Sequence, residues 1–118
     1  MSSPAQESHT WVVEAIGGVP TTEPRPAIAL GEDGLITGTT GVNRLVGTYV
    51  AEDDRIKVEG MGLTRMAGPP AAMDQERRLL GALEGWQSFR FGNGRLQIGP
   101  ADTGLVCGLA QPGSTSIT

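Results

Sequence analysis

The sequence contains very few of the residues from which catalytic and metal centres are usually built. Among its 118 residues there is one cysteine, Cys107, and one histidine, His9. One cysteine excludes an intrachain disulfide, and no group of histidine, cysteine or acidic residues has the spacing of metal ligands. We therefore predict no catalytic residues, no metal site and no cofactor, and the sequence favours a protein that is not an enzyme.

A simple structural interpretation is available for each residue that could carry chemistry, namely His9, Cys107, Asp53 and Asp54. His9 ends a polar segment, where a rigid site is not expected, and Cys107 lies in an apolar run, where a thiol packs as a small core residue. Asp53 and Asp54 are adjacent, so in an extended chain their carboxylates point to opposite faces and do not converge.

Basic and aromatic residues are scarce as well. Lysine occurs once, the eight arginines are scattered, and the formal net charge is −4 with a pI near 4.8. Nucleic-acid binding needs clustered positive charge, so no nucleic-acid partner is predicted. Aromatic residues make up 4% of the chain, and the core is expected to consist mainly of valine, leucine, isoleucine and methionine.

Long apolar runs are missing. No stretch approaches the roughly 20 residues that span a bilayer as a helix, so no transmembrane segment is predicted. The first ten residues are polar and lack the apolar core of a signal peptide, which with the missing disulfide favours a cytoplasmic protein. The length fits one domain, with residues 1–9 expected to be disordered, residues 10–110 folded and residues 111–118 a flexible tail.

Short runs of β-branched and apolar residues, separated by turn residues, predict a mainly β fold. The predicted strands cover residues 10–16, 27–30, 35–38, the second part of 39–50, 55–59, 60–66, 87–91, 96–98 and 105–109. Asp33-Gly34 and Gly92-Asn93-Gly94 are typical of tight hairpin turns. About eight strands at this spacing indicate a curled antiparallel sheet or a partly open β-barrel.

Residues 71–86 differ in composition and predict one amphipathic helix, inserted before the last three strands. Its apolar side is expected to carry Met73, Leu79, Leu80, Leu83 and Trp86. We expect this helix to cover an open end or face of the sheet.

The order of several motifs resembles the META domain, as found in HslJ-type heat-shock proteins. The resemblance depends on Gly-x-Asn-x-x-x-Gly-x-Tyr at residues 41–49, on Thr-Arg-Met-Ala at residues 64–67 and on Glu76 at the start of a leucine-rich helix. It covers about residues 10–110 and implies the same fold and a link to stress response, but no reaction. Members of the family usually carry cysteine where this chain has Val42 and Gly68; if those two positions are neighbours, the loss of both cysteines together is physically coherent.

Five polar residues within these motifs form the candidate ligand or partner surface. They are Asn43, Arg44, Tyr49, Thr64 and Arg65. The structural alternative is that Asn43 bonds to backbone groups at a bend while Arg65 pairs with an acid such as Glu76.

Three functions remain open on these grounds. The first is a non-enzymatic binding or structural module, with a variant in which the barrel holds a small apolar or lipid-like ligand. The second is an enzyme with a polar pocket around Asn43 and Arg65. The third is an interaction module that adds a strand to a protein partner through an exposed edge, which a closed barrel would rule out. The chain is expected to be a monomer or a weak homo-oligomer.

Overall fold

The computed structural model describes residues 10–100 and 102–109, so His9 and the two predicted flexible ends lie outside the described residues. The strands are β1 (Thr10–Ile16), β2 (Val19–Pro20), β3 (Ala27–Leu30), β4 (Leu35–Thr39), β5 (Arg44–Glu52), β6 (Arg55–Leu63), β7 (Trp86–Gly92), β8 (Arg95–Ile98) and β9 (Leu105–Leu109). One helix, α1 (Pro70–Ala82), separates β6 from β7.

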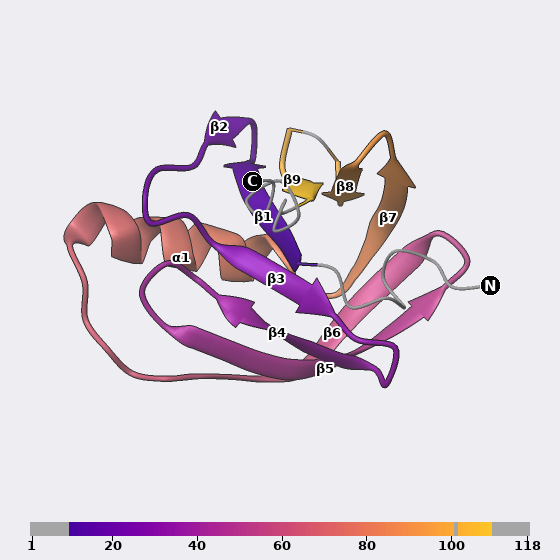
Figure 1. Ribbon diagram of the computed structural model, residues 1–118, viewed down its shortest axis with the longest axis horizontal. Helices are drawn as coiled ribbons and strands as arrows, with labels where there is room; N and C mark the ends of the chain where they lie inside the picture. Colours follow the sequence, from indigo (N-terminus) through magenta and orange to yellow (C-terminus); the bar gives the residue numbers. More distant parts are fainter. Residues whose placement is uncertain (1–9, 101, 110–118) are drawn as a thin grey trace, which may run out of the picture.

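The strands form a closed antiparallel barrel (Figure 1). Their order is β2-β1-β3-β4-β5-β6-β7-β8-β9, and the pairing of β9 with β1 closes the ring. The two-residue strand β2, which the sequence did not indicate, adds to β1 outside the eight-stranded ring. The mainly β architecture with one helix before the last three strands is confirmed, and the sheet takes the form of a barrel.

Tight turns connect the hairpins where the sequence indicates them. Gly34 between β3 and β4 has a φ of 83°, and Asn93 and Gly94 between β7 and β8 have φ angles of 52° and 73°. Positive φ at both Asn93 and Gly94 is what a type I′ two-residue turn requires, because its twist then matches that of the strands.

Side chains of alternating strand residues fill the barrel. On β1, Trp11 and Val13 are buried, and a bulge before Ala15 shifts the alternation so that Ile16 is the next buried residue. Leucine, isoleucine and valine make up most of the core, together with Cys107. Leucine and isoleucine dominate as expected, but among the described residues valine contributes only Val13 to the buried cluster, and Met61 is only partly buried against it.

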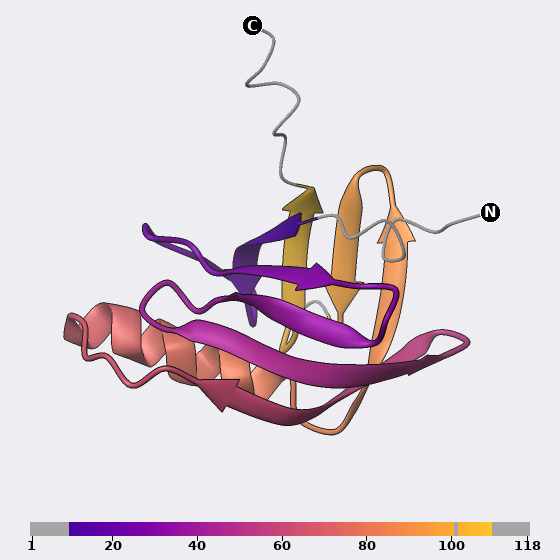
Figure 2. The same ribbon diagram turned by 60° about the horizontal axis from the view of Figure 1, so that its bottom comes forward.

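Helix α1 lies across one end of the barrel (Figure 2), and Leu79 and Ala82, together with Leu83 just after the helix, close this end. It has no side-chain N-cap, and polar contacts to the connection between β2 and β3 help to hold it. Gln75 Oε1 accepts the Thr22 N–H at 3.0 Å and Gln75 Nε2 donates to the Thr22 carbonyl at 3.2 Å.

The helix is shorter than predicted, because it ends at Ala82 and Gly85 then turns the chain with a φ of 70°. Trp86 was expected on the apolar side of the helix, but it begins β7 opposite Lys57. Its ring lies on the surface under the Arg55 guanidinium, 4.8 Å from the ring centroid.

The seam between β6 and β7 is much shorter than β6 itself. Only Arg55, Ile56 and Lys57 pair with β7, whereas pairing with β5 follows β6 to Leu63. The two strands predicted at 55–59 and 60–66 are thus one strand with an irregularity near Gly60. Within the described residues, the second half of β6 has no strand partner on its other side.

Among the described residues, no helix has the length and apolar character needed to cross a membrane.

Cys107 gives the first testable prediction. Burial, and secondarily the Glu14 carboxylate, raise the pKa of its thiol to about 12 from an ordinary value of 9.0. Because a folded-state pKa above the unfolded one favours the folded state only while the thiol stays protonated, we expect the free energy of unfolding to fall as pH rises from 9 towards 12, by up to about 1.4 kcal/mol per pH unit.

Urea unfolding at several pH values measures this loss, and Cys107→Ala should show a shallower dependence on pH. The native thiol should also resist alkylation at pH 8 and react once the protein is unfolded. Rapid alkylation of the native protein would contradict the buried position of Cys107.

Candidate binding site

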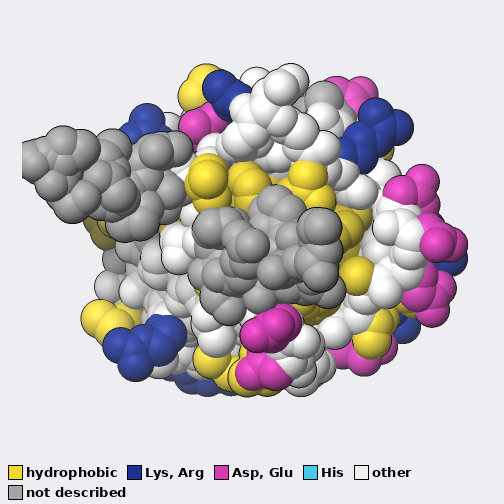
Figure 3. All heavy atoms as spheres, turned by 45° about the vertical axis from the view of Figure 1, so that its right-hand side comes forward, with side chains coloured by type: hydrophobic (Ala, Val, Ile, Leu, Met, Phe, Trp, Pro, Cys, Tyr) yellow, Lys and Arg dark blue, Asp and Glu magenta, His cyan; other side chains and the backbone are white. Residues whose placement is uncertain are grey.

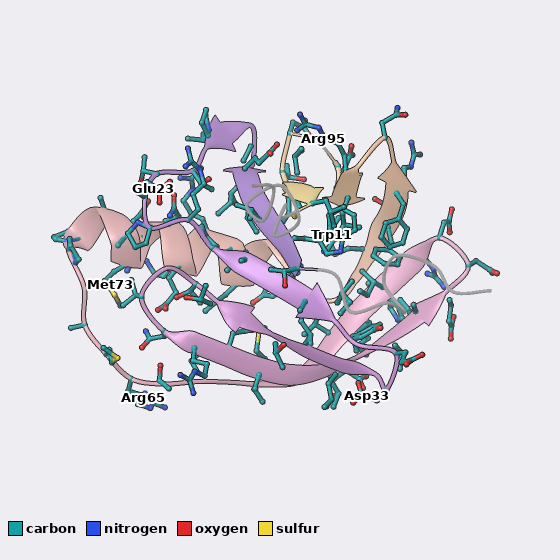
Figure 4. The ribbon with its side chains drawn as sticks, viewed as in Figure 1. Trp11, Glu23, Asp33, Arg65, Met73 and Arg95 are labelled. Carbon is teal, nitrogen blue, oxygen red and sulfur yellow. The ribbon has the colours of Figure 1, made fainter. Side chains whose placement is uncertain are left out.

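A pocket of about 580 Å³ opens between the second half of β6, the connection that follows it and the start of α1. Its lining residues are Asn43, Met61, Gly62, Leu63, Thr64, Arg65, Met66, Ala67, Met73 and Glu76. Figure 4 shows Arg65 and Met73 at the same end of the molecule, with Asp33 at the far end of the strands. The volume lies within the roughly 300–1,000 Å³ typical of small-ligand sites.

The buried side chain of Asn43 connects the three segments that form this pocket. Its Oδ1 accepts the Met66 N–H at 2.7 Å and the Thr64 hydroxyl at 3.0 Å. Its Nδ2 donates to the Met66 carbonyl at 3.1 Å and to Glu76 Oε1 at 2.9 Å. An amide side chain offers two acceptor and two donor positions, so the hydrogen-bonding capacity of Asn43 is used up inside the protein.

Thr40 completes this network from the β4–β5 turn. Its hydroxyl donates to Glu76 Oε1 at 2.6 Å and accepts the backbone N–H of Asn43 at 2.9 Å. Both Thr40 and Glu76 are buried. Two donors from the turn therefore hold one oxygen of the helix carboxylate and tie α1 to the sheet.

The turn has this shape because of Gly41. Its φ is 98°, and a Cβ at this position would lie only 2.5 Å from the Pro24 carbonyl oxygen. Only glycine combines a positive φ with such a close approach at low cost. The bend that places Thr40 and Asn43 against the helix thus depends on a glycine that contributes no side chain to the network.

Glu76 is 6% exposed, and its second oxygen, Oε2, receives no hydrogen bond from the described residues. The only sealed, unpaired side-chain polar atom among the described residues is Trp11 Nε1. Glu76 lines the pocket and its Oε2 is not among the sealed atoms, from which we infer that this oxygen is open to the pocket. It is the one acceptor of the network that a ligand could use.

The structure separates the five predicted surface residues into three groups. Asn43 and Thr64 meet in the network, while Arg44 and Arg65 are exposed at the rims of this pocket and of an adjoining hollow of about 450 Å³. Tyr49 lies elsewhere on β5 and donates to the Gly31 carbonyl at 2.6 Å. Burial, and then the Asp33 carboxylate, raise the pKa of Tyr49 above its ordinary value.

The structural alternative for these residues is half right. Asn43 does bond to backbone groups at a bend, but Arg65 makes no ion pair with Glu76 or with any other described residue. Figure 4 shows its side chain projecting away from the ribbon. The acid instead pairs with Thr40 and Asn43, because α1 presents Glu76 to the barrel end rather than to the rim.

Sequence reasoning missed the importance of Glu76 and of the methionines. The sequence indicated Glu76 only as a motif residue at the helix start and as a partner for Arg65, and its burial became evident only in the structure. Met61, Met66 and Met73 come from strand, connection and helix, so no local pattern joins them. Within the described ranges, no three His, Cys, Asp or Glu side chains are placed to share a metal ion.

A second, smaller pocket of about 310 Å³ lies at the end of the barrel away from α1. It is lined by Trp11, Phe91, Gly92, Asn93, Gly94, Arg95 and Leu109. The Trp11 and Phe91 rings have centroids 5.6 Å apart. Figure 3 shows hydrophobic side chains on part of the face that is turned to the right in Figure 1.

Val42 and Gly68 are neighbours in space. A Cβ on Gly68 would lie 3.7 Å from the Cβ of Val42, within the 3.5–4.5 Å that a disulfide spans. The two positions at which this chain lacks the cysteines of the resembled family are therefore in contact with each other. They join the β4–β5 turn to the connection that leads to α1.

Comparison with known proteins agrees with these observations. A family model described as the META domain matches residues 5–111. Two solved structures share the fold. One, an NMR structure of a protein, has a TM-score of 0.72 and 25% identity, covering 92% of this chain and 96% of that chain. The other, an NMR structure of a protein from Burkholderia xenovorans, has a TM-score of 0.67 and 20% identity, covering 91% and 86%. No curated protein matches the sequence.

The network predicts different effects for two substitutions of Glu76. Glu76→Ala leaves the Thr40 hydroxyl and an Asn43 N–H unpaired in a buried place, so we expect a loss of about 2–4 kcal/mol in the free energy of unfolding. Glu76→Gln keeps an oxygen at Oε1 and should cost less than about 1 kcal/mol. Urea denaturation measures both.

Asp74→Ala is the matched control, because Asp74 is an exposed acid of the same helix, paired only with Arg77 at 3.3 Å. It should change stability by less than about 0.5 kcal/mol. Equal losses for the alanine and glutamine variants of Glu76 would show that the Oε1 contacts do not stabilise the fold.

Restoring a cross-link between Val42 and Gly68 should stabilise the protein. The double variant Val42→Cys, Gly68→Cys should form a disulfide in air and raise the free energy of unfolding by about 2–4 kcal/mol over its reduced form. Mass spectrometry counts the free thiols, and each single variant serves as a control. After oxidation one free thiol, that of Cys107, should remain, and three free thiols would mean that the connection is not held next to the turn.

Proposed function

This chain belongs to the META domain family, and on that basis we propose that it is a non-enzymatic binding module whose site is the pocket between β6 and α1. The observation that carries the proposal is a pocket of about 580 Å³ whose buried polar floor is already hydrogen-bonded within the protein. The resemblance to HslJ-type heat-shock proteins makes stressed cells the setting in which we would look for its ligand.

Binding fits this pocket better than catalysis does. A general base or nucleophile needs a partner that activates it and a free position towards the substrate. Here Asn43 and Thr64 hydrogen-bond to each other and to backbone groups. Tyr49 donates to the Gly31 carbonyl in a distant turn. The polar pocket of the enzyme hypothesis therefore has a rigid floor but no converging reactive set.

The walls of the pocket suit an apolar or amphipathic ligand. Met61, Leu63 and Met73 are partly buried, and Met66 is 62% exposed at the rim. Methionine side chains are flexible and polarisable, so they adapt to ligands of different shape. Arg65, which has no ion-pair partner among the described residues, adds a positive charge at the entrance.

The second pocket supports a second candidate, a small apolar ligand at the opposite end of the barrel. The observation that favours it is Trp11 Nε1, which is sealed from solvent and has no hydrogen-bond partner among the described residues. The apolar residues Trp11, Phe91 and Leu109 line this pocket, and a ligand could reach the unpaired N–H only if the indole ring moved.

A fragment screen by NMR separates the two candidates. We expect amphipathic fragments to shift the backbone amides of residues 61–67, 73 and 76 in the ¹⁵N-labelled chain. Met61→Trp should fill the pocket and abolish these shifts, whereas Val46→Trp, on an exposed residue outside the pocket lining, should not.

Shifts confined to Trp11, Phe91 and their neighbours would favour the second candidate. No shifts at either end would leave the protein a structural module and overturn the proposal. Native mass spectrometry of protein purified without added ligand complements the screen, because a co-purified ligand adds mass that is lost on denaturation.

A further inference from the structure

We infer that the ligand of this site is an extended peptide segment of a partner protein, which adds a strand to the free edge of β6 and places a lysine or arginine side chain on Glu76. This inference rests on the proposed binding function and names the class of ligand.

The free edge of β6 offers backbone groups to such a strand. Pairing with β7 ends at Lys57, so residues 58–63 remain, a length of about 20 Å at 3.3 Å per residue. The Thr64 N–H donates to the Arg44 carbonyl on β5 at 3.1 Å. Because alternate residues of an antiparallel strand face the same neighbour, the N–H and C=O of Leu63 point away from β5, towards the free side.

Closure of the barrel does not remove this edge. A closed barrel was expected to rule out strand addition, because closure pairs every strand on both sides. Here one seam of the ring, between β6 and β7, consists of only three residue pairs, and the rest of β6 extends past it. An unpaired strand edge is a template for another strand. Strand addition is therefore excluded where β6 pairs with β7, but not along residues 58–63.

Glu76 selects the side chain that enters the pocket. It is 6% exposed, its Oε1 is held by Thr40 and Asn43, and its Oε2 faces the pocket without a donor from the described residues. A buried carboxylate is strongly favoured when a cationic group bonds to it. Arg65 is a cationic residue of the pocket lining, but it makes no ion pair with Glu76 and lies at the rim. There its positive charge favours an acidic residue in the peptide next to the inserted lysine or arginine.

A lipid-like occupant fits these groups less well. An acyl chain could pack against Met61, Leu63 and Met73. It would also exclude water from the pocket, and Glu76 Oε2 and the Leu63 backbone would then have no hydrogen-bond partner. A peptide satisfies both, since its backbone pairs with the edge and its cationic side chain reaches the carboxylate.

Peptide selection with N-methylated analogues tests the inference. Random nine-residue peptides displayed on phage are selected on the full chain, and the enriched peptides are synthesised with two analogues, N-methylated at alternate amides in the two possible registers. Strand addition places every second amide against β6, so one analogue should lose at least about tenfold in affinity while the other stays within about threefold of the parent.

The protein side is tested with matched variants. Glu76→Gln keeps the Oε1 contacts and should weaken lysine-containing peptides about tenfold, as expected for one charge-assisted bond. Glu52→Gln removes the same charge from an exposed residue of β5 that pairs with Arg55, away from residues 58–63, and should have little effect. Amides of residues 58–63 and 76 should shift when peptide binds.

Three results would overturn the inference. They are the absence of enriched peptides, equal binding of both N-methylated analogues, and shifts located at Trp11 and Phe91 instead of β6. If fragments bind the pocket in the NMR screen and peptides do not, the binding function stands and the peptide inference alone fails. If neither binds, both fail.

Discussion

The amide of Asn43 is the interaction on which the functional end of this molecule depends. It joins the β4–β5 turn, the connection after β6 and helix α1 through four hydrogen bonds. Buried polar groups stabilise a unique arrangement only when all of them are paired, and here the amide is fully paired. Because α1 lacks a side-chain cap, its position depends on such contacts of Gln75 and Glu76 with the sheet and its loops, and the pocket exists only while the helix stays there.

The insertion of the helix also explains why the barrel has an overhanging strand. After Leu63 the chain leaves the sheet, forms α1 across the barrel end and re-enters the sheet at Trp86. Strand β7 can therefore pair only with the first residues of β6. The same detour provides the helix wall of the pocket, so the free edge and the pocket are two consequences of one feature of the topology.

Val42 and Gly68 illustrate how this end of the fold can be held in different ways. Their positions are close enough for a covalent bridge, yet in this chain a valine side chain packs over a glycine and the hydrogen bonds of Asn43 to Met66 hold the connection. Its single thiol, Cys107, is buried in the core on the opposite part of the ring and takes no part in the site.

The sequence by itself determined the class of fold, the hairpin turns and the existence of one helix, because alternation of apolar residues, positive-φ turn residues and helix formers act locally. It also selected Asn43 and Thr64 through the resembled motif. Closure of the barrel, the early end of the helix and the strand position of Trp86 were decided by pairing between distant segments. The burial of Glu76 belongs to this second group: a helix residue 33 positions after Asn43 in sequence meets it only because α1 folds back across the barrel end, and no local pattern records which side of a helix will face such a partner.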